Sequence, residues 1–180
     1  MCKLDLKDAY FTVPLHSRSQ KFIHYQFQGR TYQFTCLPFG LSSAPRIFNK
    51  FLKPVTGLLR KMGIWMIVYL DDMLIMNSTL EGAREDILIL KSILENLGFL
   101  INTAESIFIP VQVIEFLGVI VDSTNMMFLL PDEKVVVIQK ECRHLVSRQV
   151  ASLSQLSNII GKLTSCKITV LQAPLHYRGI

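Results

Sequence analysis

The fold is decided by residues 63–76, GIWMIVYLDDMLIM, in which two apolar arms flank an acidic pair. Each arm has the length and the content of aliphatic and aromatic side chains that are typical of a strand. Asp71 and Asp72 interrupt the apolar run at the point where a tight turn would join the two strands. We therefore predict a β-hairpin that carries two adjacent carboxylates at its tip.

Adjacent carboxylates repel each other, and burial adds a cost of desolvation to each. A hard divalent cation such as Mg²⁺ relieves both costs, because it prefers carboxylate oxygens and commonly completes its shell with phosphate. An ordinary turn is the alternative interpretation, since Asp is a common turn residue. The acidic pair by itself leaves both interpretations open.

A third acid, Asp5, ends another predicted strand, residues 3–6, which runs into the sequence KDAYF. Two-metal phosphoryl transfer uses acids from separate strands, which hold two Mg²⁺ ions about 3.5–4 Å apart. We therefore expect Asp5, Asp71 and Asp72 to converge in space. For Asp8 the alternative to a role in this site is a favourable charge at a helix N-terminus.

Outward from these acids, alternating apolar residues over 23–28 and 32–34 predict a second hairpin. Ser42 or Ser43, with Pro45 in the first turn, suits the start of a helix over residues 43–60. Its apolar stripe predicts that Phe48, Phe51 and Leu52 are buried.

Farther along, Ser78 to Glu81 fits a capping box before another helix. Residues 99–109 predict two short strands, and residues 115–121 pair with 126–129. From residue 131 the pattern becomes helical, with a second capping box formed by Ser152 and Gln155. The composition shift near residues 130–131 predicts a domain over 1–130 followed by a small helical segment over 131–180. Grouped strands and helices indicate an α+β fold, with an antiparallel sheet and helices packed on one face.

The composition of the 180 residues bounds the class of protein. Half of the residues are hydrophobic and 18% are charged, with a mean hydropathy of +0.35, which argues against long disorder. The longest apolar run, residues 63–70, is shorter than the roughly 20 residues of a spanning helix, and the first ten residues carry acids where a signal peptide would carry an apolar core. We expect an intracellular protein, cytoplasmic or nuclear, with no membrane partner.

Charge and cysteine usage add two weaker indications. The net charge of +5 favours nucleic acid as a partner, although charge alone is weak evidence. The four cysteines show no zinc-ligand spacing with each other or with histidine, which predicts reduced thiols.

Five stretches together resemble the motifs of reverse transcriptases, which are RNA-directed DNA polymerases. Residues 3–11 (KLDLKDAYF) resemble motif A, 37–48 (LPFGLSSAPRIF) motif B, 69–72 (YLDD) motif C, 97–102 (LGFLIN) motif D and 115–118 (EFLG) motif E, the primer grip. They stand in the family's order over residues 3 to about 121. The stretches 130–134 (LPDEK) and 173–178 (APLHYR) resemble the segment after the polymerase in retrotransposons of the DIRS type, which encode a tyrosine recombinase.

The resemblance implies a polymerase palm that transfers nucleotides from a deoxynucleoside triphosphate (dNTP) to a primer 3′-hydroxyl on an RNA or DNA template. Asp5, Asp71 and Asp72 match the catalytic acids, which bind two Mg²⁺ ions, with Mn²⁺ as a substitute. The nucleotide-binding positions are Leu6, Asp8, Ala9, Tyr10, Phe39 and Gly40, and the primer grip is Phe116, Leu117 and Gly118. Tyr10 matches the steric gate against a 2′-hydroxyl. Without the motifs, Tyr10, Phe116 and Leu117 would pass for core residues.

Two departures from the family's pattern bear on activity. Glu105 stands where motif D carries a lysine that assists departure of pyrophosphate. Motif A begins at residue 3, so we expect an N-terminally truncated chain without the fingers, and little polymerisation by the chain alone. An inactive retroelement remnant that keeps the palm fold is therefore the alternative. A nucleotide cyclase with the same acids is a third hypothesis, disfavoured because a cyclase needs neither motif B nor a primer grip. The sequence does not indicate an oligomeric state.

Overall fold

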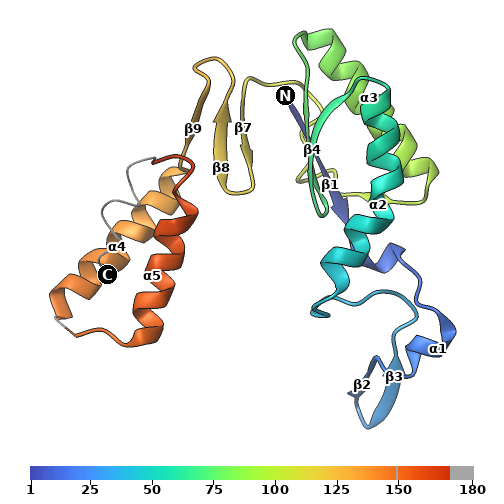
Figure 1. The fold of residues 1–180 in the computed structure, drawn as a ribbon, viewed down its shortest axis with the longest axis horizontal. Coiled ribbons are helices and arrows are strands. Elements are labelled where there is room, and N and C mark those ends of the chain that lie inside the picture. Colours follow the sequence, from blue (N-terminus) through green and yellow to red (C-terminus); the bar gives the residue numbers. More distant parts are fainter. Residues whose placement is uncertain (149, 171–180) are drawn as a thin grey trace. The chain divides into compact units, whose positions relative to one another are not determined.

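The computed structural model describes residues 1–148 and 150–170. The chain divides into two compact units, Met1–Val111 and Gln112–Ile180, whose elements are labelled in Figure 1. The predicted change from strands to helices near residues 130–131 falls inside the second unit, between its last strand and its first helix. Residues 173–178, which carry part of the subfamily resemblance, lie outside the described residues.

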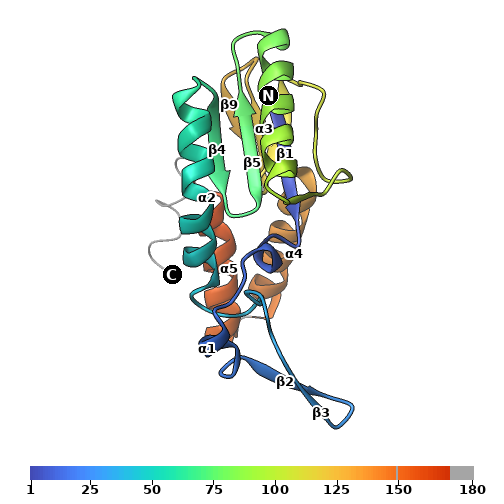
Figure 2. The same ribbon diagram turned by 90° about the vertical axis from the view of Figure 1, so that its right-hand side faces the viewer.

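The first unit is built on a four-stranded sheet in the order β4-β5-β1-β6. Its strands are β1 (Cys2–Lys7), β4 (Trp65–Tyr69), β5 (Asp72–Met76) and β6 (Leu100–Ile101), and every neighbouring pair is antiparallel. Helices α2 (Ala44–Lys61) and α3 (Leu80–Asn96) cover one face, as Figure 2 shows. The predicted α+β class, with helices on one face of an antiparallel sheet, is confirmed.

Strand β1 lies between β5 and β6 in the sheet, and its side chains alternate between the two faces. Cys2, Leu4 and Leu6 are buried in the core, and the Cys2 thiol lies 3.8 Å from the carbonyl oxygen of Ala83 in α3. The intervening residues of the strand, Asp5 among them, therefore face away from the helices. The strand thus joins the core on one face to an acidic residue on the other.

Helix α2 has Pro45 in its first turn, as predicted, but Ser43 makes no side-chain cap hydrogen bond. Phe48 and Leu52 are buried as expected. The prediction that Phe51 is buried is wrong, because 44% of this residue is exposed. The buried positions of α2 recur every three or four residues, and Phe51 lies about 100° around the helix from Leu52.

The boundaries of other elements also differ from prediction. Helix α3 is capped by Thr79, whose hydroxyl accepts a hydrogen bond from the Gly82 N–H at 3.0 Å, so the predicted box beginning at Ser78 is one residue early. Between residues 99 and 109 only β6 is a regular strand, and Ile107 forms an isolated bridge to β1.

The remaining elements of the first unit are a short 3₁₀ helix η1 (Ala9–Thr12), helix α1 (Ser17–Gln20) and the predicted hairpin, formed by β2 (His24–Phe27) and β3 (Arg30–Gln33). Tyr25 and Tyr32 stack across the hairpin with ring centroids 5.5 Å apart. Both views show the hairpin standing away from the four-stranded sheet (Figures 1 and 2).

The second unit contains three antiparallel strands, β7 (Val113–Phe116), β8 (Val119–Asp122) and β9 (Met127–Leu129), followed by α4 (Asp132–Arg148) and α5 (Leu153–Ser165). The predicted single strand over 115–121 is wrong, because Leu117 and Gly118 turn the chain with φ of 52° and 71°. The capping box of Ser152 and Gln155 is confirmed.

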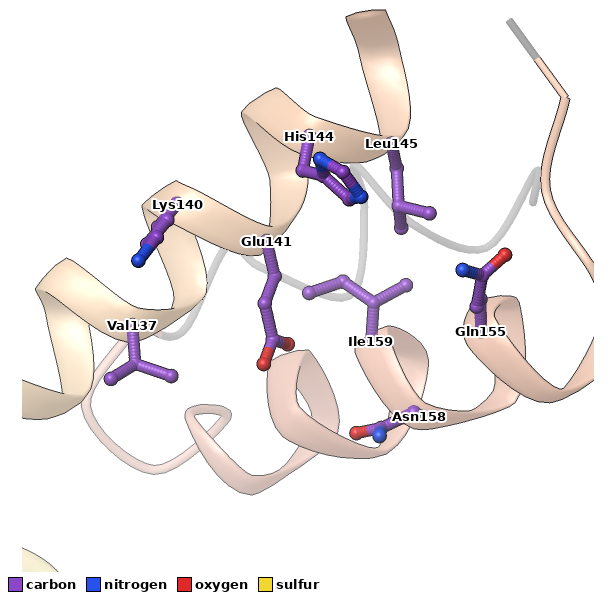
Figure 3. A pocket seen from close by; sticks show the side chains of 8 residues that line it. All are labelled: Val137, Lys140, Glu141, His144, Leu145, Gln155, Asn158 and Ile159. Atoms are coloured by element: carbon purple, nitrogen blue, oxygen red, sulfur yellow. The ribbon is translucent and has the colours of Figure 1, made fainter. Parts of the chain in front are cut away.

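Helices α4 and α5 pack against each other around a cavity of about 570 Å³. Figure 3 shows Glu141 and His144 of α4 opposite Ile159 of α5 there, and Glu141 forms an ion pair with Lys162. Across the described ranges, all four cysteines are free, as predicted. None of the helices in these ranges is both long enough and apolar enough to cross a membrane.

Candidate active site

The three predicted acids come together at one end of the sheet. The antiparallel register of β1 and β5 puts Asp5 directly opposite Asp72, and Asp71 belongs to the two-residue loop of the β4–β5 hairpin. Directly opposed residues have Cα atoms about 4.5–5.5 Å apart. The Leu6 N–H donates a hydrogen bond to the carbonyl oxygen of Asp71 at 3.1 Å, which ties the loop to β1. The predicted convergence in space is therefore confirmed.

The loop that presents Asp71 is conformationally costly. Leu70 has a φ of 56°, and its side chain makes this left-handed conformation unfavourable by about 1–2 kcal/mol. Two-residue hairpin loops normally place Gly, Asn or Asp at such positions. Strain of this kind is concentrated at functional sites, where the surrounding structure holds it in place.

A loop over residues 102–106 holds Asp5 from the other side. The Asp5 N–H donates to the Ser106 hydroxyl at 3.0 Å, and that hydroxyl donates to the Asn102 carbonyl at 2.7 Å. The Asn102 N–H donates to the Asp5 carbonyl at 2.9 Å. The sequence reasoning missed Ser106 as a support for Asp5. The signal was its position four residues after Asn102, directly beyond the end of motif D.

The surroundings of Asp5 and Asp71 disfavour the ionised form of each carboxyl group. Burial is the largest cause that raises the pKa of Asp5, followed by repulsion from Asp72, Glu105 and Asp71, while a hydrogen bond from Asn102 opposes the shift. Burial likewise raises the pKa of Asp71, with further repulsion from Asp72 and Glu105. The carboxylate of Glu105 therefore adds negative charge to a site that already has an excess.

One cation partly neutralises the site. Lys3 Nζ lies 3.2 Å from Asp72 Oδ1, and the two side chains are 18% and 25% exposed. Lys3 also counteracts the raised pKa of Asp71. The sequence reasoning missed Lys3. The signal was its position two residues before Asp5, on the same face of the strand.

The chemistry of the donors fits a divalent cation, because all three candidate ligands are carboxylates and Asp5 and Asp71 carry poorly neutralised charge. In their present arrangement, however, no three acidic, histidine or cysteine side chains of the described residues form a group that could hold a metal ion. Asp72 is instead paired with Lys3. Binding of two Mg²⁺ ions stays a prediction.

The predicted nucleotide-binding residues of motif A follow Asp5 along the chain, and most of them are buried. Leu6 and Ala9 are buried, and Asp8 has a left-handed φ of 53° where η1 begins. Tyr10 is also buried, and its pKa is raised by burial and by the negative charge of Asp71. A cavity of about 360 Å³ lies beside Asp8 and is lined in part by Phe51, which explains why that ring is not in the core.

Aromatic contacts fix Tyr10 in place. Its ring centroid lies 4.8 Å from that of Phe39 and 5.3 Å from that of Phe48. Phe39 is itself exposed, and Gly40 follows it with a φ of 84°. The structure thus brings Tyr10 and Phe39 together, and their roles toward a nucleotide stay predictions.

The predicted primer-grip residues lie in the second unit, at the β7–β8 turn. Phe116 is buried, while Leu117 is exposed at the tip. Lys134 Nζ donates to the carbonyl oxygen of Gly118 at 3.5 Å, a contact at the limit of hydrogen bonding that links the turn to α4. Contact with a primer stays a prediction for these residues.

Comparison with known proteins gives the geometry a family context. The family model described as "Reverse transcriptase (RNA-dependent DNA polymerase)" matches residues 1–121. The Gag-Pol polyprotein of Walleye dermal sarcoma virus is 25% identical over 174 residues, which is 96% of this chain and 9% of the polyprotein. The enzymatic polyprotein of Cestrum yellow leaf curling virus is 30% identical over 163 residues, 89% of this chain and 24% of the polyprotein.

A solved structure of the foamy viral protease-reverse transcriptase, in complex with an RNA/DNA hybrid, has the same fold. It superposes with a TM-score of 0.74 at 21% sequence identity, over 97% of this chain and 23% of that chain. The chain therefore spans less than a quarter of the length of these relatives. The similarity to the solved structure concerns the fold alone.

Proposed function

Because the chain belongs to the reverse transcriptase (RNA-dependent DNA polymerase) family, we propose that it supplies the palm that adds deoxynucleotides to a primer 3′-hydroxyl on an RNA or DNA template. The observation that carries this proposal is the register that sets Asp5 opposite Asp72 and beside Asp71. Polymerisation needs acids from separate strands at one point, and this register provides them.

Asp5, Asp71 and Asp72 are the residues that would hold two Mg²⁺ or Mn²⁺ ions. When bound, such ions activate the 3′-hydroxyl and neutralise the triphosphate and the departing pyrophosphate. The chain's own contribution is to position the carboxylates before substrate arrives. The hydrogen bonds from Leu6 to the Asp71 carbonyl and from Asp5 to Ser106 do this, because they fix the backbone on which the acids stand.

The primer-template and the dNTP are the proposed partners. The backbone of Asp8 and Ala9 meets the triphosphate, and Tyr10 forms the floor under the sugar. Contacts with Phe39 and Phe48 prevent Tyr10 from moving aside, so a 2′-hydroxyl would collide with its ring. Gly40, which has no side chain, lets the backbone beside Phe39 approach the nucleotide.

A remnant without catalysis is the alternative, and one observation favours it. Glu105 raises the pKa of Asp5 and Asp71 from a position where motif D of the family has a lysine. Residues 130–134 (LPDEK) support an origin in a retrotransposon of the DIRS type. Either a live or a decayed element of that type would carry these residues, so the decision rests on a measurement of activity.

Single-turnover addition of one nucleotide to a labelled primer on an RNA template tests the proposal. With Mg²⁺, we expect the chain alone to add little nucleotide, to prefer the complementary dNTP over the other three in what it adds, and to lose this addition in Asp71→Asn. A ribonucleotide should enter only when Tyr10 is replaced by alanine. Equal, untemplated traces in wild type and Asp71→Asn would establish the inactive remnant instead.

A further inference from the structure

We propose that Lys3 is a built-in counter-ion of the acidic site, whose ammonium group must leave Asp72 before a divalent cation can use that carboxylate. This inference rests on the proposed metal-dependent function, which it deepens by naming a residue that sets the affinity for the ion. Lys3 is therefore a positioning residue rather than a catalytic one, since it acts through Asp72.

The register of the sheet puts Lys3 in reach of Asp72. Lys3 and Asp5 are two residues apart on β1, so both side chains lie on the face of the sheet away from the helices. Asp5 is opposite Asp72 and Lys3 is opposite Leu74, which makes Lys3 the diagonal neighbour of Asp72. Diagonal pairs on one face of a sheet interact when one side chain is long.

The backbone of Lys3 cannot move with its side chain. Its N–H donates to the Ile107 carbonyl at 3.0 Å, and its carbonyl accepts from the Ile107 N–H at 2.7 Å. On its other side Lys3 pairs with Leu74 of β5. Only the flexible stem of the lysine is free to swing, so the ammonium group can leave Asp72 without any change in the sheet.

The ion pair between Lys3 and Asp72 is largely shielded from solvent. Both side chains are at least three-quarters buried, so solvent screens this pair less than a pair on the surface. The other two ion pairs of the described residues, Lys91 with Glu95 and Lys162 with Glu141, involve none of the three catalytic acids. Within the part of the chain that the structure describes, Lys3 is thus the only cation paired with the acidic site.

Competition follows from the shared oxygen. Lys3 Nζ contacts Asp72 Oδ1, one of the two oxygens that Asp72 can offer to a metal ion. The free energy of the Lys3–Asp72 ion pair therefore lowers the free energy of binding of the metal ion. The bound ion in turn weakens the ion pair by the same amount, because the coupling is reciprocal. Lys3 thereby stabilises the metal-free site and lowers its affinity for the ion.

Titration of Mn²⁺ into the full 180-residue chain, followed by the electron paramagnetic resonance of free Mn²⁺, tests this account. Lys3→Met keeps the length of the side chain and removes its charge, and we expect it to tighten binding on the order of tenfold. Lys3→Arg keeps the charge and should keep the weaker affinity. These two variants separate the charge of Lys3 from its packing.

Lys7→Met is the matched control. Lys7 is on the same strand and face, two residues beyond Asp5 as Lys3 is two before, but it is exposed and takes part in none of the ion pairs of the described residues. We expect less than about a twofold change in affinity from Lys7→Met, because a solvated charge is largely screened. Equal tightening by both variants would overturn the proposal, since a general field effect would then explain it.

A second measurement needs no variant and therefore does not depend on whether Lys3→Met folds. Acylation of lysine amines in the wild-type chain, quantified by peptide mass spectrometry, reports the accessibility of each ammonium group. We expect labelling of Lys3 to rise several-fold when Mg²⁺ is added, while labelling of Lys7 is unchanged. Unchanged labelling of Lys3 at a concentration of Mg²⁺ that saturates the site would contradict the exchange.

Failure of this inference can be told apart from failure of the proposed function. Saturable Mn²⁺ binding that is lost in Asp71→Asn but identical in wild type and Lys3→Met would overturn the role of Lys3 and leave the metal site intact. Absence of saturable binding in every variant would overturn the metal-dependent function, and the role of Lys3 with it.

Discussion

Two buried aspartates, one in each unit, experience opposite environments. Asp5 is 9% exposed and Asp122 is 8% exposed, yet the pKa of Asp5 is raised and that of Asp122 is lowered. Asp122 accepts hydrogen bonds from the N–H groups of Thr124 and Asn125 and from the Asn125 side chain, at 2.8, 3.0 and 2.8 Å. Asp5 has a side-chain hydrogen bond with Asn102, and three neighbouring acids repel its negative charge.

The opposite pKa shifts of Asp5 and Asp122 distinguish a functional carboxylate from a structural one. The fold satisfies Asp122 with donors two and three residues away, so this aspartate closes the β8–β9 turn. The fold buries Asp5 and brings it against Asp72 across strands, and both effects raise the pKa of Asp5. Groups whose ionisation the fold disfavours are concentrated at functional sites, because a substrate or an ion supplies what is missing.

The largest expected effect is on catalysis. Asp5→Asn should lower the rate of single-nucleotide addition about 10³-fold or more, since it removes a charge that phosphoryl transfer requires. Asp122→Asn makes the same chemical change in the second unit and should leave the rate near that of wild type. A comparable loss in both variants, measured by rapid quench on a primed RNA template, would break the distinction between the two aspartates.

The next effect is on stability in the second unit. Asp122→Ala removes the acceptor of three hydrogen bonds, so we expect a lower midpoint of thermal unfolding. Because the folded-state pKa of Asp122 lies below its usual value of 3.8, this stabilisation is present above pH 3.8 and is lost as the pH falls through the lower value. Circular dichroism melts should therefore show the gap to wild type narrowing in acid.

Asp5→Asn should change stability in the opposite direction. Removing a buried, repelled charge should raise the thermal midpoint at pH 7 by about 2–4 °C, the equivalent of roughly 1 kcal/mol for a chain of this size. The folded-state pKa of Asp5 is raised, so its ionisation destabilises the fold above that pKa, and the gain should vanish as the pH falls below 3.8. A lower midpoint at pH 7 would show that Asp5 serves the fold instead.

Much of this comparison could be predicted from the sequence. The apolar arms around Asp71-Asp72 predict the hairpin, and the need for acids from separate strands predicts that Asp5 joins them. The ion pair of Lys3 with Asp72 could not be predicted, because it depends on the register of two strands almost 70 residues apart. The role of Asp122 was missed as well, although its position three residues before Asn125 is a turn signal.

The errors in the fold have related causes. The stripe of α2 contains more apolar residues than the sheet can cover, so Phe51 faces a cavity while Phe48 and Leu52 fill the core. A continuous apolar run hid the turn between β7 and β8, although Gly118 inside a strand pattern was a warning of a break. In both cases the hydrophobic pattern predicted that an element was present. It did not predict which residues face the core or where the chain turns.

The smallest expected effect sharpens the electrostatic side of the comparison. Glu105→Gln removes a negative charge that raises the pKa of Asp5 and Asp71, so both values should move down toward the usual range. The pKa of Asp122 should not change. Carboxyl ¹³C titrations measure all three, and Glu85→Gln, an exposed acid on α3, is the matched control. Identical shifts in the two variants would mean that Glu105 has no specific place in the site.

Titration of Mg²⁺ against the side-chain carboxyl ¹³C resonances tests whether Asp5, Asp71 and Asp72 form one metal site. We expect the signals of Asp5, Asp71 and Asp72 to shift together and to saturate at one concentration of Mg²⁺, because these carboxylates share the ions. The signal of Asp122 should stay still, because hydrogen bonds already occupy both of its oxygens. Saturation at Asp122, or no saturable shift at the three acids, would contradict the account.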